Sequence, residues 1–211
     1  MGISFGKRLG WMLPLALVLG VLFAVMDWPL WIALTVFVIL AGMEIPIMLY
    51  ILYGSQNLKQ LAQYIDRQQK NPVFVFLHCL REGTDEELLE AIDTVLEKYK
   101  QPKVQAVYGA NKAMMLRDFD TAHRLAEPIA SSEIGQYTLA LIEAMQGNRE
   151  AAARYSIQKE WMKASIEANL AFVEKDWQVF RQDAEKAVRS AKGIQYYSNT
   201  YIFKRMEKEW Q

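Results

Sequence analysis

Two long apolar runs dominate the first 53 residues of the chain. The run over residues 9–26 contains no charged side chain, and the run over residues 28–53 contains only one, Glu44. As helices rising 1.5 Å per residue they would extend about 27 Å and about 39 Å, while the hydrocarbon core of a bilayer is about 30 Å thick. Because a helix of a water-soluble domain has a polar face, this pattern predicts two transmembrane helices over these ranges.

The charges around the two runs predict their orientation. A short turn at Asp27 makes the runs an antiparallel hairpin, and this turn carries no Lys or Arg. Lys7 and Arg8 precede the hairpin, and Lys59 follows it. Since Lys and Arg near membrane helices favour the cytoplasmic side, we expect both termini and residues 54–211 in the cytoplasm, at a bacterial-type inner (cell) membrane.

A cleaved signal peptide is the alternative interpretation of residues 1–26. Lys7 and Arg8 would then form its basic region. The segment 24–26 does not have the small-x-small pattern of a cleavage site, and a second apolar run follows at once. Even with cleavage, the run over 28–53 would leave residues 54–211 on the cytoplasmic side.

Glu44 is the one ionisable side chain within the predicted spans. Such a residue is a functional candidate, because a charge inside a membrane is costly. Counted along an antiparallel hairpin, Glu44 falls near the level of Trp11, about one turn from Arg8, so an anchoring role by pairing with Arg8 is the structural alternative. A functional Glu44 would make the chain an accessory subunit of a membrane transporter or channel.

Residues 54–211 show apolar positions at a spacing close to 3.6. Thr84 and Glu87 form a capping box before the first clear stripe, which covers 88–99. The best strand candidate, 73–77 after Pro72, is short and continues with helical spacing. The pattern therefore predicts an all-α domain, with further helices around 104–115, 122–129, 134–145, 151–155, 166–173 and 179–188.

Short breaks divide these helices at a recurring interval. The intervals from Gly83 to Arg117, from there to Gly147 and from there to Lys175 are 34, 30 and 28 residues. Each break is expected to separate two helices of about 12–16 residues. A period near 34 residues of helix–turn–helix units is typical of tetratricopeptide-type solenoids.

Two segments carry a local resemblance to that repeat. Residues 117–122 (RDFDTA) and 147–152 (GNREAA) resemble its turn and following small residue, with Ala126 and Pro128 where its second helix tends to end. Residues 72–192 thus resemble the tetratricopeptide-repeat-like superfamily, in a degenerate form with Phe180 in place of a small residue. The resemblance implies an α-solenoid with a concave, protein-binding groove. An irregular helical bundle would give similar spacing.

The remaining segments complete the predicted organisation. Residues 1–53 form the transmembrane hairpin, 54–71 a linker helix, and 193–211 a C-terminal capping helix. The chain has 24 basic and 24 acidic residues, and two of each precede residue 54, so the domain is also balanced. A balanced surface argues against nucleic-acid binding.

We find no catalytic constellation, so the sequence does not predict an enzyme, a cofactor or a metal site. His78 adjoins the single Cys79, and adjacent helical side chains point apart. Asp118 and Asp120 are interpreted as a turn cap, and the acidic residues 86, 87 and 90 as the first turn of a helix.

The predicted function is therefore binding. We expect a membrane-anchored adaptor or scaffold that holds a cytoplasmic protein or peptide beside the bilayer. The polar positions on first helices that could line a groove are Asn111, Arg117, Gln136, Tyr137, Glu143 and Asn169.

Overall fold

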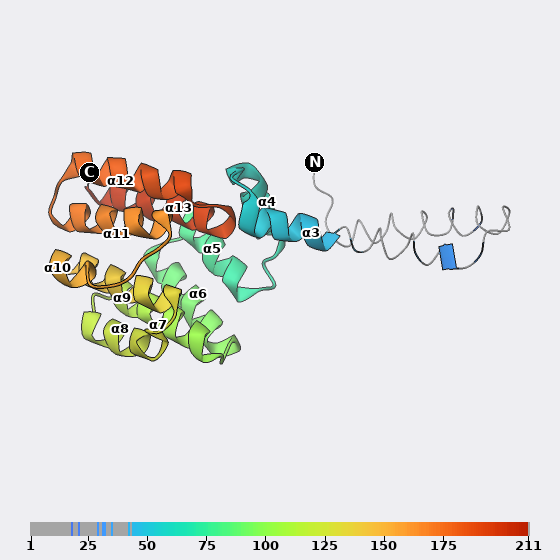
Figure 1. The fold of residues 1–211 in the computed structure, drawn as a ribbon. Coiled ribbons are helices and arrows are strands. Elements are labelled where there is room, and N and C mark those ends of the chain that lie inside the picture. Colours follow the sequence, from blue (N-terminus) through green and yellow to red (C-terminus); the bar gives the residue numbers. More distant parts are fainter. Residues whose placement is uncertain are drawn as a thin grey trace. The chain divides into compact units, whose positions relative to one another are not determined.

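The computed structural model describes residues 44–210 together with Val18, Val21, Pro29, Trp31, Ile32, Thr35 and Gly42. The chain divides into two compact units, Met1–Ser55 and Gln56–Gln211 (Figure 1). Because the described residues before Glu44 are only seven single positions, the predicted spans over 9–26 and 28–53 lie largely outside the described residues. Within the described part of the chain, no helix combines the length and the apolar character needed to cross a membrane.

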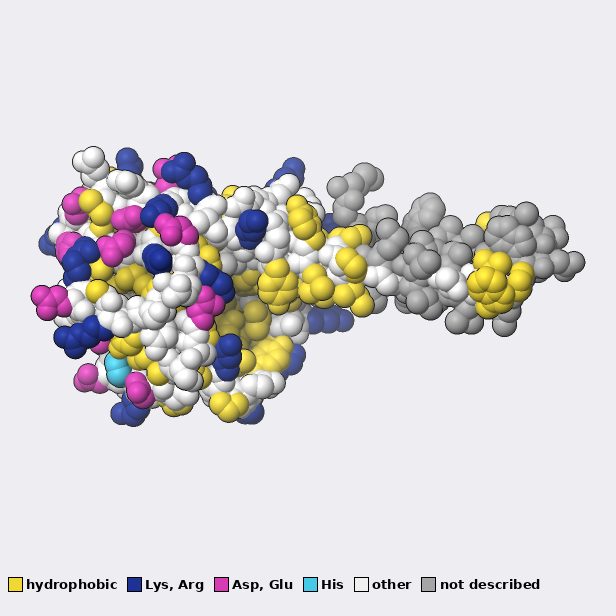
Figure 2. Space-filling view, in the orientation of Figure 1, with side chains coloured by type: hydrophobic (Ala, Val, Ile, Leu, Met, Phe, Trp, Pro, Cys, Tyr) yellow, Lys and Arg dark blue, Asp and Glu magenta, His cyan; other side chains and the backbone are white. Residues whose placement is uncertain are grey.

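The continuous described part of the first unit is short, helical and apolar. Helix α3 covers Glu44–Leu49, and a π-helical turn, η1, covers Tyr50–Gly54. The turn closes with the N–H of Ser55 donating to the carbonyl oxygen of Tyr50 at 2.8 Å. Large apolar side chains here are exposed to solvent, for example Ile45 at 59% and Tyr53 at 71% (Figure 2).

The second unit is built only from helices. No strand occurs among the described residues, which confirms the all-α class for them. The helices are α4 (Leu58–Arg67), α5 (Pro72–Glu82), α6 (Asp85–Lys98), α7 (Pro102–Met115), α8 (Phe119–Ala126), the 3₁₀ turn η2 (Glu127–Ile129), α9 (Glu133–Met145), α10 (Arg149–Ala152), α11 (Glu160–Val173), α12 (Trp177–Ser190) and α13 (Gly193–Trp210).

Helices that follow one another pack as hairpins. The extensive contacts are within the pairs α5–α6, α7–α8, α9–α10 and α11–α12, and α9 also packs against α7 and α11. Small side chains allow this close packing. In the α11–α12 hairpin, Ala164, Ala168 and Ala171 share one buried cluster with Ala184 and Ala187. A larger side chain at these positions would hold the two helices apart.

Three of these hairpins share one turn geometry. The second residue after the first helix has a left-handed backbone, with φ of 57° at Arg117, 78° at Gly147 and 60° at Lys175. In each turn the N–H of the next residue donates, at 2.9 Å, to the carbonyl five residues earlier, as in a Schellman-type helix end. The α5–α6 turn differs, because Gly83 has φ −85° and a capping box follows it.

The second helices of two hairpins are shorter than the sequence suggests. The expectation of 12–16 residues is wrong for α8, which has eight, and for α10, which has four. Pro128 follows α8, and proline cannot continue the helical hydrogen-bond ladder. After α10 the chain leaves the helix, so that Tyr155 and Ile157 pack on a buried cluster that includes α9 and α11 side chains.

The last helix returns to the beginning of the unit. Helix α13 contacts α12, α4 and α5 (Figure 1). Arg205 donates to the carbonyl of Gly83 at 2.9 Å and pairs with Asp85, while Gln56 donates to the carbonyls of Arg189 and Ala191 at 2.8 Å. In an open solenoid each terminal repeat contacts one neighbour only, so this contact between the two ends is a departure from that arrangement.

Candidate functional site

A cleft of about 370 Å³ lies between α5 and α6. The cleft is open to solvent, and the side chains of Glu82, Glu87, Glu90 and Thr94 in its walls are exposed. Helix α5, the turn and helix α6 all contribute to its walls, which consist of Val75, His78, Cys79, Glu82, Gly83, Glu87, Glu90, Ala91 and Thr94.

Local sequence signals fix both helices that form the cleft. Helix α5 begins with Pro72 at a helix start, where its missing N–H costs nothing, and the side chain of Asn71 accepts from the N–H of Val73 at 3.0 Å. Helix α6 begins with the capping box of Thr84 and Glu87, as the sequence predicts. These caps fix the residue at which each wall of the cleft begins.

Glycine allows the close turn between these helices. A Cβ atom added to Gly83 would lie 2.9 Å from the carbonyl oxygen of Cys79, which is too close for a real contact. The N–H of Gly83 donates to that same oxygen at 2.8 Å. The same Cβ atom would lie 3.0 Å from Glu87 Oε2, so a larger residue would disturb both the end of α5 and the capping box at the start of α6.

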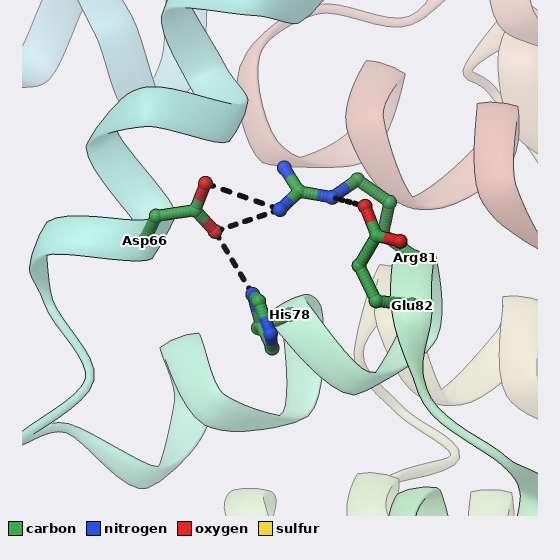
Figure 3. A network of polar contacts seen from close by, with 4 residues as sticks. All are labelled: Asp66, His78, Arg81 and Glu82. Carbon is green, nitrogen blue, oxygen red and sulfur yellow. Dashed lines mark hydrogen bonds and ion pairs between the residues drawn. The ribbon is translucent and has the colours of Figure 1, made fainter.

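A network of polar side chains borders the cleft (Figure 3). Asp66 extends from α4 toward two residues of α5, with its Oδ1 atom 2.9 Å from His78 Nδ1 and 2.8 Å from Arg81 Nη2. Arg81 Nε donates to Glu82 at 2.8 Å. Because His78 and Glu82 also line the cleft, the network connects one wall of the cleft to helix α4.

The network changes the charge behaviour of Asp66. Burial raises the pKa of its carboxyl, but the hydrogen bonds from His78 and Arg81 outweigh this, and the pKa lies below its ordinary value. Asp66 is thus an anion over the physiological pH range. It neutralises Arg81, which leaves little net positive charge behind the cleft.

The cleft itself is acidic. Its walls carry Glu82, Glu87 and Glu90 but no Lys or Arg. Burial, and then the negative charge of Glu87, raise the pKa of the Cys79 thiol, with a smaller contribution from Glu90. Cys79 is therefore a protonated, weakly nucleophilic thiol at neutral pH. A thiol in this state does not suit nucleophilic chemistry.

No metal centre is found in the part of the chain that the structure describes. Among those residues, no group of three or more His, Cys, Asp or Glu side chains is placed to hold a metal ion.

Two of the sequence-predicted binding residues, Tyr137 and Asn169, hydrogen-bond to the same residue, Ser165. The hydroxyl of Tyr137 on α9 lies 3.0 Å from the hydroxyl of Ser165 on α11, and the side chain of Asn169 donates to the Ser165 carbonyl at 2.8 Å. The Tyr137 ring also packs edge-on against Trp161, with ring centroids 5.1 Å apart. Burial raises the pKa of Tyr137 to about 12. The contacts of Tyr137 with Ser165 and Trp161 join α9 to α11, whereas the hydrogen bond of Asn169 lies within α11.

The other four candidates are spread along the unit. Gln136 donates to the carbonyl of Ala130 and accepts from the N–H of Ser156, so it links segments on both sides of α9. Glu143 accepts from a side chain of the next turn, Arg117 occupies the left-handed position of the α7–α8 turn, and Asn111 is half-buried on α7. The six positions do not form one cluster.

Sequence reasoning did not predict the cleft. It interpreted His78 only as a neighbour of Cys79, and the acidic residues of α6 only as a favourable first turn. A signal was present, because Glu87, Glu90 and Thr94 are spaced by three and four and so share a helical face. What the pattern could not show was that this face of α6 would look onto α5.

No protein-family model, curated protein or solved structure matches the chain.

Proposed function

We propose that this chain is a membrane-anchored adaptor, in which residues 9–26 and 28–53 span the bilayer and the second unit binds a cytoplasmic protein partner. The observation that carries the membrane part is the exposure of large apolar side chains just before the polar unit. Six of them expose at least 36% of their surface, namely Ile45, Ile47, Met48, Leu49, Tyr50 and Tyr53. Contiguous apolar surface of this kind is rare in water and is typical of contact with lipid or protein.

The architecture of the second unit supports a binding role. Three hairpins joined by the same left-handed turn favour the resemblance to tetratricopeptide-like repeats, which commonly bind proteins. On the face shown in Figure 2, basic and acidic side chains are interspersed, which suits a soluble domain held near the bilayer. Confinement to the membrane would raise the effective concentration of the domain toward partners located there.

Membrane attachment is tested by alkaline extraction of membranes that contain the full-length protein. We expect the protein to stay in the membrane pellet, because two spans resist extraction. Orientation is tested with a membrane-impermeant amine reagent on intact cells, and Lys103, which is exposed, should stay unlabelled until the cells are opened. Recovery of the protein in the soluble fraction without detergent would refute the anchor, and labelling of Lys103 in intact cells would refute the orientation.

Partner binding is tested with a photo-crosslinking amino acid placed at single positions in membranes. Thr94 in the cleft and Gln178 on α12 are suitable, because both are exposed. An adaptor gives a crosslink to a defined protein from at least one surface position. A parallel Glu44→Gln variant separates the adaptor from a transporter subunit, because an adaptor keeps its crosslinks and its biological activity, whereas a subunit with Glu44 in its pathway keeps the crosslinks and loses the activity.

A further inference from the structure

We propose that one end of the second unit is a docking surface for the headgroups of anionic phospholipids. This basic end comprises the start of α4 and the junction of α12 with α13, and its cations are Lys59, Arg189 and Lys192. The inference rests on the membrane anchor proposed above and deepens it, because it names the class of lipid that the anchored unit contacts.

Hydrogen bonds bring these distant segments of the chain together. The side chain of Gln56, just before α4, donates at 2.8 Å to the carbonyls of both Arg189 and Ala191 at the end of α12. Helix α13 then packs against α4. Lys59 lies in the first turn of α4, and Lys192 directly follows Ala191. The three cations therefore belong to the same end of the unit.

No acidic residue balances the cations within these segments. Residues 56–65 and 188–203 contain the three basic residues and no Asp or Glu. The chain as a whole has as many acidic as basic residues, so its carboxylates are concentrated elsewhere. On the face shown in Figure 2, Lys and Arg but no Asp or Glu side chains lie over α4. The basic end thus differs in charge from the rest of the unit.

The cations of the basic end are available to an external anion. Lys59 and Lys192 are exposed, and neither pairs with a carboxylate among the described residues. Arg189 pairs with Glu185 at 3.3 Å, but the two side chains are 70% and 64% exposed, and such exposed pairs are weak. A phosphate group can therefore bind these side chains with little competition from within the protein.

A short linker would hold the basic end close to the bilayer. Only residues 54–57 separate the predicted span, which ends at Tyr53, from the start of α4 at Leu58. Even fully extended, this segment reaches no more than about 18 Å. Anionic lipids of the cytoplasmic leaflet attract basic segments that directly follow a membrane helix. The anchor would thus keep these lipids within reach of the three cations.

An anionic bilayer fits the basic end better than other polyanions do. An acidic protein or a nucleic acid would have to compete with headgroups that the anchor already holds at a high effective concentration. Gln63, one helical turn after Lys59 and on the same face of α4, is exposed and adds an amide N–H donor for a phosphate oxygen. The surface therefore offers both charge and hydrogen bonds to a headgroup.

The contact is tested by energy transfer with the full-length protein in lipid nanodiscs. A fluorescent donor is attached at Ser190→Cys in a Cys79→Ser background, because Ser190 is exposed and Cys79 is the only native cysteine. A headgroup-labelled lipid is the acceptor. The control position is Gln178→Cys, near the other end of α12 and about 18 Å away along the helix.

The expected result is a dependence on lipid charge at one label position only. Transfer from position 190 should be about twofold higher in discs with about one-third phosphatidylglycerol than in discs of phosphatidylcholine alone, since each basic side chain at an anionic surface favours the contact about fivefold. The increase should vanish at high salt, and transfer from position 178 should not rise. Equal transfer from position 190 in both kinds of disc would overturn the inference.

Variants connect the increase to the cations of the basic end. Lys59→Gln combined with Lys192→Gln removes the two unpaired cations and should abolish most of the increase. Lys103→Gln combined with Lys163→Gln is the matched control, because it removes the same charge from two other exposed lysines, and it should keep the increase. Equal losses in the two double variants would overturn the inference. Circular dichroism of each variant shows whether the fold is retained.

The outcomes separate the lipid contact from the adaptor function. A protein that enters the discs but shows the same transfer with both lipid compositions has an anchor without this lipid-binding surface. A protein that does not enter the discs counts against the anchor and, with it, against the lipid contact. An increase that requires an added acidic protein or nucleic acid, in place of phosphatidylglycerol, would overturn the lipid contact while leaving the anchor intact.

Discussion

At Gly135, near the start of α9, the backbone of the preceding turn lies too close to leave room for a side chain. A Cβ atom added at Gly135 would lie 1.9 Å from the carbonyl oxygen of Ile129 and 2.4 Å from its carbonyl carbon. That oxygen already accepts from the N–H of Ser132 at 2.9 Å and from the Ser132 hydroxyl at 2.8 Å. The Ser132 hydroxyl in turn accepts from the N–H of Gly135 at 3.1 Å. Gly135→Ala is therefore expected to disturb the whole turn before α9.

The size of the effect follows from two opposing contributions. To bring the new methyl group into ordinary contact, the backbone at Ile129 must move by roughly 1.5 Å. Overpacking of this kind costs about 1–3 kcal/mol, and the upper end applies here because a backbone carbonyl cannot rotate away as a side chain can. Replacing Gly by Ala within a helix returns about 1 kcal/mol. The net expectation is a loss of about 2 kcal/mol of stability, or a Tm lower by about 4–8 °C for a domain of this length.

The assay is unfolding of the full-length protein in detergent, followed by circular dichroism against temperature and urea. Gly109→Ala is the matched control, because its new methyl would meet only the tip of the Leu125 side chain, at 3.1 Å. We expect this control to lie within about 1 kcal/mol of the parent protein, since Leu125 can rotate. A Gly135→Ala protein that is as stable as the control would refute the reasoning from the backbone approach.

Three further changes test other parts of the structure by the same unfolding assay. Thr84→Ala removes the capping box made with Glu87 and should cost about 1 kcal/mol. Asp66 has a lowered pKa in the folded protein, so its contacts with Arg81 stabilise the fold fully above the unfolded carboxyl pKa of about 3.9. This stabilisation is lost as the pH falls through the lower folded pKa. Asp66→Asn should therefore make stability less dependent on pH below about 4, and unchanged acid sensitivity would contradict this. Tyr197 is fully buried, and its hydroxyl has no hydrogen-bond partner within the described residues. Tyr197→Phe should therefore leave the stability unchanged or raise it by up to about 1 kcal/mol. A clear loss of stability would show that the hydroxyl has a partner such as buried water.

Helix starts and turns were the features most accessible to sequence reasoning. The sequence predicts Asp118 as a cap, and its carboxylate accepts from the N–H of Thr121 at 3.0 Å. The segment 73–77, rich in residues that favour strands, lies within helix α5. Its Asn71 cap and Pro72 start favour a helix, and these local signals prevailed over the propensity of the side chains for strands.

Helix lengths and the candidate site were less accessible, because they depend on distant contacts. The short α10 ends where Tyr155 and Ile157 find a place in a cluster that includes side chains of α9 and α11. The network of Asp66 with His78 and Arg81 joins residues 12 and 15 positions apart on different helices. Nothing in the periodicity indicates that these side chains meet, since periodicity assigns a face to each helix but not a neighbour to each face.

By itself, the sequence determined the all-α character of the second unit, the positions of its caps and breaks, and the apolar nature of the first 53 residues. It could do so because caps, breaks and hydropathy depend on a few neighbouring residues. Only the tertiary structure decided which helix faces meet, and hence the acidic cleft between α5 and α6 and the return of α13 to α4 and α5. These features arise from residues up to 135 positions apart, as in the hydrogen bond from the Gln56 side chain to the Ala191 carbonyl. Their free energy exists only once the helices are packed.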